Sequence, residues 1–104
     1  LLKRTSTVTE LAAGGITINT AAHTVKAGAA AVSLTPREYE LLLYLAQHLG
    51  SARTRQQILQ DVWKSVNLGE ARTVDTHIKN LRMKLGQCGA QLKTIRGSGY
   101  LLEA

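Results

Sequence analysis

The stretch RTVDTHIKNLRMKL, residues 72–85, decides the fold class, because its apolar residues recur at the spacing of a helix with one buried side. At about 100° per residue, one narrow arc holds Val74, Ile78, Leu81 and Leu85. Gly86 follows directly, and glycine is common just past a helix end. The pattern predicts a helix from about residue 71 to residue 85 that turns only this arc toward a core.

The opposite side of this helix is polar and basic. The residues that point away from the core are Thr76, Lys79, Asn80 and Met83. His77 with Lys84, and Asp75 with Arg82, lie on the two flanks. A helix roughly 10–12 Å across fits the major groove of B-DNA, and lysine, asparagine and threonine side chains suit base edges. The outward face is therefore a candidate for contact with duplex DNA.

Helix start signals stand at residues 35–38. Thr35 is a hydroxyl cap, Pro36 occupies the first helical position, and Glu38 is a carboxylate three residues after the cap. The apolar residues that follow at helical spacing are Tyr39, Leu42, Leu43, Ala46 and Leu49. The pattern predicts a scaffold helix that ends at Gly50, with Glu38 serving as a cap.

A second cap, Thr54 with Gln57 three residues later, predicts another short helix. Its apolar side comprises Ile58, Leu59, Val62 and Trp63. Residues 51–53, between the two helices, leave room only for a brief strand or bend. We expect the ring of Trp63 to be partly buried.

Strands are predicted at both ends of the chain. Short alternating runs before Thr35 contain Ile16, Ile18, Val25, Val32 and Leu34, which predicts about four antiparallel strands. Residues 1–14 are either a linker or a loosely attached first strand, and we place the domain boundary near Gly14 and Gly15, with the domain over 15–104. Residues 92–96 and 100–103 predict a hairpin around Gly97-Ser98-Gly99.

Positive charge is concentrated near the third helix. Thirteen lysines and arginines oppose seven acidic residues, for a net charge of +6 over 104 residues. Residues 72–96 contain six of these cations and one aspartate, and so carry +5 of the +6. Such a localised patch predicts a polyanionic partner: nucleic acid, an anionic membrane surface or an acidic protein. A hairpin with Arg96 at its tip can reach a DNA minor groove.

Several kinds of site are not supported. Cys88 is the single cysteine, so no internal disulfide can form and a reducing, cytoplasmic compartment is expected. The three histidines have no ligand-spaced partners, so we expect no metal and no cofactor. Ser98 lacks a general base, so no enzyme is predicted. Asp75 is interpreted as structural, paired with Lys79 or Arg72. No apolar run approaches the roughly 18 residues of a membrane span.

Four linked motifs carry a family resemblance over roughly residues 16–102. They are Leu34-Thr35 followed by Glu38 and Leu41-Leu42; Leu59 with Trp63; Arg72-Thr73-Val74-Asp75 with His77-Ile78, Leu81-Arg82 and Lys84-Leu85; and Arg96-Gly97 with Gly99-Tyr100. In these motifs the sequence resembles the OmpR/PhoB-type winged-helix DNA-binding domain of bacterial two-component response regulators. The resemblance implies an α+β winged helix-turn-helix, with an N-terminal four-stranded antiparallel sheet, three helices and a C-terminal hairpin wing.

The resemblance also implies residue roles in sequence-specific DNA binding and transcription regulation. A recognition helix over 72–85 would enter the major groove, and a wing over 92–103 the minor groove. The base-reading residues would be Thr76, Lys79, Asn80, Met83 and Arg96. The phosphate contacts would be Trp63, Arg72, Thr73, His77, Arg82, Thr94, Gly97 and Tyr100. Gly97 and Gly99 would let the turn approach phosphates closely. The sequence departs from the common pattern at Asn80, where many members carry Arg and where asparagine favours adenine, and at Lys64, where many carry Gly.

Partners follow from the same resemblance. It implies an upstream receiver domain phosphorylated by a sensor kinase, and head-to-tail dimers on direct-repeat DNA operators formed by a domain that is monomeric alone. It also implies a contact between loop 64–70 and RNA polymerase. Two alternatives stay open: the same domain in a one-component or membrane-tethered regulator, and a winged-helix module whose third helix binds an acidic protein.

Overall fold

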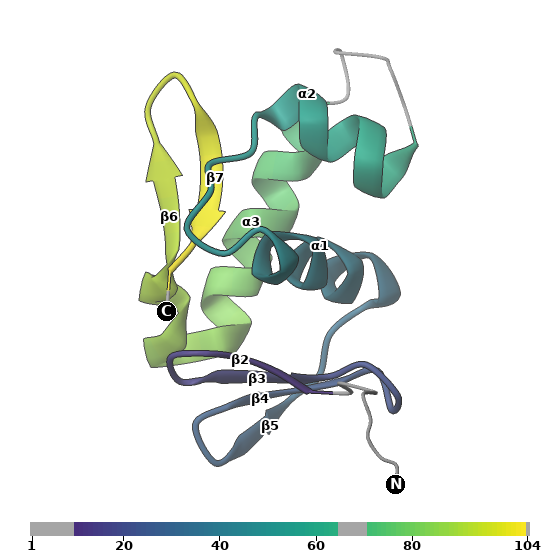
Figure 1. The fold of residues 1–104 in the computed structure, drawn as a ribbon, viewed down its shortest axis with the longest axis vertical. Helices are drawn as coiled ribbons and strands as arrows, with labels where there is room; N and C mark the ends of the chain where they lie inside the picture. Colours follow the sequence, from purple (N-terminus) through teal and green to yellow (C-terminus); the bar gives the residue numbers. More distant parts are fainter. Residues whose placement is uncertain (1–9, 65–70, 104) are drawn as a thin grey trace, which may run out of the picture.

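A four-stranded sheet forms one end of the molecule in the computed structural model, which describes residues 10–64 and 71–103 (Figure 1). Its strands are β2 (Glu10–Ala13), β3 (Ile16–Asn19), β4 (Thr24–Ala27) and β5 (Ala30–Val32). They lie in the order β2-β3-β4-β5, and every neighbouring pair is antiparallel. The four predicted strands are confirmed, and the first lies before Gly14. Residues 1–9 of the predicted linker or first strand are outside the described residues.

One face of this sheet is buried. Alternation along the strands puts Ala13, Ile16, Ile18 and Val25 on the inner face, where each is at most 3% exposed. Figure 1 shows helix α1 (Pro36–Gln47) lying over this face. The sheet therefore closes one end of a single core, and the three helices fill the rest.

Helix α1 begins as predicted. The Thr35 hydroxyl accepts a hydrogen bond from the Glu38 N–H (3.2 Å), and the Glu38 carboxylate accepts one from the Thr35 N–H (2.9 Å). This reciprocal capping box satisfies two backbone donors that a helix start leaves without partners.

The end and the buried side of α1 differ from the prediction. The helix ends at Gln47, and Leu49 is 42% exposed. Its buried residues are Glu38, Tyr39, Leu41, Leu42 and Leu45. Apolar residues stand on several sides of the leucine-rich run, so spacing alone could not select the buried side. After the helix end, the Gly50 N–H donates to the Leu102 carbonyl (2.9 Å), which attaches this turn to the C-terminal strand.

The second helix is short. Helix α2 (Arg55–Ile58) carries the predicted capping box of Thr54 and Gln57. It continues into a π-helical segment, η1 (Leu59–Trp63), which ends at Lys64 with a left-handed φ of 57°. Glycine adopts this conformation at least cost, so the departure at Lys64 falls on a position that favours glycine. Residues 65–70, which include most of the loop expected to contact polymerase, lie outside the described residues.

Helix α3 (Ala71–Leu85) matches its prediction closely. Its buried residues are Val74, Ile78, Leu81 and Leu85. A 3₁₀ segment, η3 (Gly86–Gln91), connects α3 to the wing. The wing follows as β6 (Leu92–Ile95) and β7 (Gly99–Leu102), within one residue of the predicted bounds.

The wing is attached to the chain just before α2. Arg53 and Tyr100 exchange backbone hydrogen bonds of 2.8 and 3.0 Å, which form an isolated β-bridge in the segment expected to be a brief strand or bend. Gly99 permits this approach: its φ is +105°, and a Cβ there would overlap the Arg53 carbonyl oxygen. The position therefore requires glycine.

The side chain of Gln91 links the two sheets. The Gln91 Nε2 donates to the carbonyls of Ala13 (2.6 Å) and Glu103 (2.7 Å), and its Oε1 accepts from the Gly15 N–H (3.0 Å). The first turn of the N-terminal sheet is thereby tied to the end of the wing. No helix within residues 10–64 and 71–103 has the length and apolar character to cross a bilayer.

Candidate nucleic-acid interface

The outward face of α3 is largely open to solvent. Thr76, Lys79 and Met83 are exposed, Met83 at 66%, while Asn80 is half-buried. The Thr76 hydroxyl donates to the Arg72 carbonyl one turn earlier (3.1 Å). The structure thus brings the four expected readers onto one accessible surface. Met83 adds an apolar side chain to an otherwise polar face.

Arg82 ties α3 to the wing. Its Nε donates to the Leu92 carbonyl (3.1 Å), and one terminal nitrogen donates to the Thr94 hydroxyl oxygen (2.6 Å). The guanidinium carbon also lies 5.9 Å from the centre of the Tyr100 ring. Two of the expected phosphate contacts, Arg82 and Thr94, are therefore bonded to each other across the joint between helix and wing.

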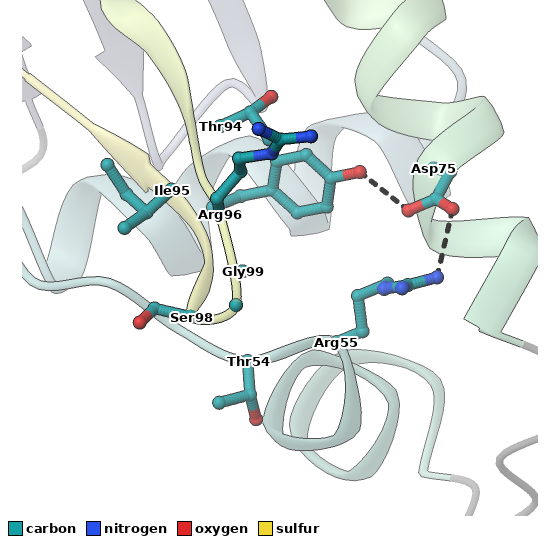
Figure 2. Close-up of a pocket in the computed structure, with 10 residues that line it drawn as sticks. Thr54, Arg55, Asp75, Thr94, Ile95, Arg96, Ser98 and Gly99 are labelled. Atoms are coloured by element: carbon teal, nitrogen blue, oxygen red, sulfur yellow. Dashed lines mark hydrogen bonds and ion pairs between the residues drawn. The ribbon is translucent and has the colours of Figure 1, made fainter.

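Asp75 makes a second connection between α3 and the wing (Figure 2). One carboxylate oxygen accepts from the Tyr100 hydroxyl (2.5 Å), and the other lies 3.1 Å from a terminal nitrogen of Arg55. Asp75 is structural, as expected, but the predicted partners, Lys79 and Arg72, are wrong. The real partners lie 25 and 20 residues away in sequence.

Both donors of Tyr100 are engaged within the protein. Its hydroxyl bonds to Asp75, and its N–H donates to the Arg53 carbonyl. Burial, and then the hydrogen bond to the Asp75 carboxylate, raise the pKa of Tyr100 to about 12. The phenol therefore stays a neutral donor to Asp75 at physiological pH.

The other flank of α3 packs against Trp63. The ring of His77 lies edge-on to the indole, with centroids 5.0 Å apart, and its Nδ1 is 2.8 Å from the Thr73 carbonyl. That contact assigns the hydrogen to Nδ1. Arg37 lies over the indole, 5.3 Å from its centre. Trp63 is partly buried, which confirms the expectation for its ring.

The C-terminal end of α3 is anchored to α1. The Lys84 ammonium lies 2.6 Å from a carboxylate oxygen of Glu38, which is only 3% exposed. Burial would raise the pKa of Glu38, but the bonds from Lys84 and Thr35 outweigh it and lower that pKa below its ordinary value. The two residues lie 46 positions apart, so local spacing could not reveal the pair.

The tip of the wing is exposed. Arg96, Gly97 and Ser98 are accessible, and a Cβ at Gly97 would meet nothing within 4 Å, although its φ is +76°. Gly97 thus leaves the tip open to an approaching ligand. Gly99 has a further role, because its missing side chain permits the close contact with Arg53.

A cleft of about 350 Å³ separates the wing from α2 and α3. Its lining residues are Thr54, Arg55, Asp75 and residues 94–100 (Figure 2). Arg55 was not predicted as a site residue, because it gives no periodic or motif signal in the sequence. Among the described residues, no group of three or more His, Cys, Asp or Glu could hold a metal ion.

A three-helix scaffold with an exposed helix face beside a braced hairpin defines a winged helix-turn-helix domain, the class expected from the sequence. Residues 29–102 match the family described as "Transcriptional regulatory protein, C terminal". The chain belongs to this family, which confirms the OmpR/PhoB-type domain expected from the motifs.

Curated and solved relatives agree with this assignment. The transcriptional regulatory protein SrrA of Staphylococcus aureus is 43% identical over 90 residues, which cover 83% of this chain and 37% of SrrA. The chain thus spans well under half the length of that relative. The Klebsiella pneumoniae RstA DNA-binding domain, solved in complex with the RstA box, superposes with a TM-score of 0.81 at 30% identity, covering 90% of this chain and 96% of that one.

A longer response-regulator chain gives a similar match. DrrB of Thermotoga maritima, described as an OmpR/PhoB homologue, superposes with a TM-score of 0.80 at 29% identity. The match covers 92% of this chain and 45% of DrrB. The family and the fold are those of transcription-factor DNA-binding domains rather than of enzymes.

Proposed function

We propose that this domain binds double-stranded DNA sequence-specifically and regulates transcription as the C-terminal effector domain of a two-component response regulator. Helix α3 enters the major groove and the wing, residues 92–103, the minor groove. The observation that carries this proposal is the open polar face of α3 beside a wing that Arg82 and Asp75 fix to the same helix. Two reading elements on a duplex must keep a constant spacing, and these bonds supply it.

Roles for individual residues form part of the proposal. Bases are read by Thr76, Lys79, Asn80, Met83 and Arg96. Phosphates are bound by Trp63, Arg72, Thr73, His77, Arg82, Thr94 and Gly97. The Thr94 hydroxyl accepts from Arg82 and keeps its own hydrogen for a phosphate. Tyr100, whose two donors are engaged internally, acts by holding the wing in place.

The partners of the whole protein belong to the same proposal. They are a receiver domain upstream, a sensor kinase, and a second copy bound head to tail on a direct-repeat operator, the isolated domain being a monomer. Loop 64–70 contacts RNA polymerase. We place the protein in the cytoplasm and assign it no catalytic activity. A one-component or membrane-tethered regulator would use this domain in the same way, whereas a protein-binding module would not require duplex DNA.

Selection against a random duplex library at near-physiological salt tests this function directly. We expect the bound pool to contain direct repeats spaced by about one helical turn. Binding without enrichment would make the basic surface a mere electrostatic anchor. Absence of duplex binding would favour the acidic-protein module.

Two substitutions separate reading from anchoring. Asn80→Ala should weaken the binding free energy by about 1–3 kcal/mol at one base pair and relax selectivity there. The control Gln47→Ala removes an exposed amide on α1 and should change neither affinity nor selectivity.

Arg82→Ala should weaken binding to all duplexes similarly and lower the slope of log K against log salt by about one. Uniform loss in the Asn80 variant, or an unchanged slope in the Arg82 variant, would contradict the assigned roles.

A further inference from the structure

The cleft between α3 and the wing has a defined place on a duplex, if the proposed function holds. A major groove and the adjacent minor groove are separated by one sugar-phosphate strand. With α3 in one groove and the wing tip in the other, that strand must pass between them. It therefore runs along the cleft lined by Arg55, Asp75 and residues 94–100.

The cleft offers cationic and hydroxyl donors to this strand. Among its lining residues, Arg55 comes from α2, Arg96 from the wing tip and Thr94 from β6. Asp75 is the single carboxylate in that lining. Figure 2 shows the Arg55 side chain reaching from α2 to Asp75. Arg55 contacts one carboxylate oxygen, and the Tyr100 hydroxyl bonds to the other.

Arg55 can change partners at little cost. Its side chain is 52% exposed, and its carboxylate partner is 39% exposed. Exposed ion pairs of this kind contribute little to stability. The guanidinium has five N–H donors in a planar fork, and this geometry suits phosphate oxygens. Tyr100 bonds the other oxygen of Asp75, so the wing stays attached when Arg55 turns toward a phosphate.

We propose that Arg55 binds a backbone phosphate of the duplex strand that crosses this cleft, and that Asp75 holds Arg55 in place before DNA arrives. This inference rests on the proposed function and adds a contact from α2, outside both the recognition helix and the wing. The ligand is a phosphodiester, so the contact adds affinity without sequence preference.

Arg55→Ala tests the contact, with Lys26→Ala as the control. Lys26 is an exposed cation on β4, in the sheet at the other end of the molecule, so both variants lose one positive charge. We expect Arg55→Ala to bind selected and random duplexes about tenfold more weakly and to lower the salt slope by about one. Lys26→Ala should keep the wild-type slope. Equal slopes in wild type and both variants would overturn the proposal.

A modified duplex identifies the partner atom. In the selected site, the phosphates between the major-groove and minor-groove contacts are replaced one at a time by uncharged methylphosphonates. One replacement should weaken wild-type binding about tenfold and leave binding by Arg55→Ala unchanged. If every such replacement weakened binding by Arg55→Ala as much as binding by wild type, the contact would be refuted.

Two further measurements separate the possible failures. Thermal unfolding of Arg55→Ala shows whether the variant is folded, and Arg55→Lys, which keeps the charge, should retain the salt slope while losing part of the affinity. If wild type selects no sequence, the proposed function fails. If wild type selects a sequence and Arg55→Ala matches its affinity and slope, only the role of Arg55 fails.

Discussion

Two clusters in this small domain use the same three residue types, a tyrosine, an aspartate and an arginine. In the scaffold cluster, the Tyr44 hydroxyl donates to Asp61 (2.6 Å) and accepts from the Arg53 Nε (3.0 Å), while a terminal nitrogen of Arg53 lies 3.9 Å from Asp61. The arginine contacts both partners, and its side chain is 22% exposed. The cluster joins α1, η1 and the chain before α2.

The cleft cluster comprises Tyr100, Asp75 and Arg55. Here the tyrosine and the arginine bond to different oxygens of the carboxylate, at 2.5 and 3.1 Å, and the arginine side chain is 52% exposed. The cluster joins the wing, α3 and α2. The difference shows that residue types alone do not distinguish a structural brace from a site that can take a ligand. The distinguishing properties are the exposure of the arginine and whether it contacts both partners or the carboxylate alone.

Gly99 supports both clusters, and its substitution should have the largest effect. Arg53 and Arg55 are two residues apart, and the Arg53–Thr54 backbone packs directly against Gly99. Gly99→Ala would overlap the Arg53 carbonyl at a φ of +105°, so we expect a loss of about 3 kcal/mol or more in the free energy of unfolding. Denaturant unfolding measures this loss.

Gly97→Ala is the matched control, because it places a Cβ in the same turn. Its φ is +76°, but nothing lies within 4 Å of the added atom. Only the left-handed backbone is penalised, by about 1–2 kcal/mol. Equal losses at the two glycines would show that packing against Arg53 does not hold the wing.

Tyr100→Phe should lower the free energy of unfolding by about 1–2 kcal/mol, because the Asp75 carboxylate loses a hydrogen-bond donor.

The raised pKa of Tyr100 also predicts that the fold loses stability at alkaline pH. Its pKa is raised to about 12 in the folded state, whereas the unfolded chain deprotonates near the ordinary value of about 10. Between these values only the unfolded state releases the proton, so stability falls as pH rises from about 10 to about 12.

Tyr44→Phe is the comparison variant for this titration. Burial and Asp61 also raise the pKa of Tyr44. Unfolding free energies measured between about pH 10 and pH 12 should fall less steeply in Tyr100→Phe than in wild type, with a smaller flattening in Tyr44→Phe. Parallel curves for wild type and Tyr100→Phe would count against a strong bond between Tyr100 and Asp75.

The smallest changes in stability are expected for Asp75→Asn and Asp61→Asn. Their effects on duplex affinity should differ, and this difference distinguishes the two clusters. Both aspartates are partly exposed, at 39% and 48%. Removing the charge at Asp75 relieves repulsion of the strand in the cleft, by about 1 kcal/mol or roughly fivefold in affinity, while the amide oxygen still accepts from Tyr100. Asp61→Asn should leave duplex affinity unchanged. Weaker binding by folded Asp75→Asn would show instead that the hold of Asp75 on Arg55 or on the wing outweighs this repulsion.

The sequence was sufficient where structure is local. The buried arc of α3 could be predicted because its apolar residues follow one clean period, and both capping boxes because they lie within four residues. In α1, leucines at successive positions fit more than one side, so the predicted face was partly wrong. The turn after α1 bonds through Gly50 to Leu102, a partner from the far end of the chain that local spacing could not reveal.

Long-range pairs lay beyond sequence reasoning. Asp75 had suitable cations at helical spacing, yet its partners came from α2 and the wing, because α3 turns this flank toward them. Glu38 was predicted as a cap, but its bond to Lys84 requires α1 and α3 to be packed first. The exposed polar face of α3 could be predicted from the helical period of its apolar residues alone. The cleft, and the position of Arg55 in it, could be recognised only in the assembled fold.

The side chain of Gln91 has a consequence for how the domain opens. Its amide holds Ala13 and Gly15 at one sheet and Glu103 at the other. Opening either sheet alone would leave part of this amide without its partners, so the two sheets are thermodynamically coupled. We expect slow backbone amides in β3 and β7 to exchange with solvent through a shared opening event. The N-terminal sheet and the wing, which are separate in sequence and share no strand pairing, then unfold as one cooperative unit.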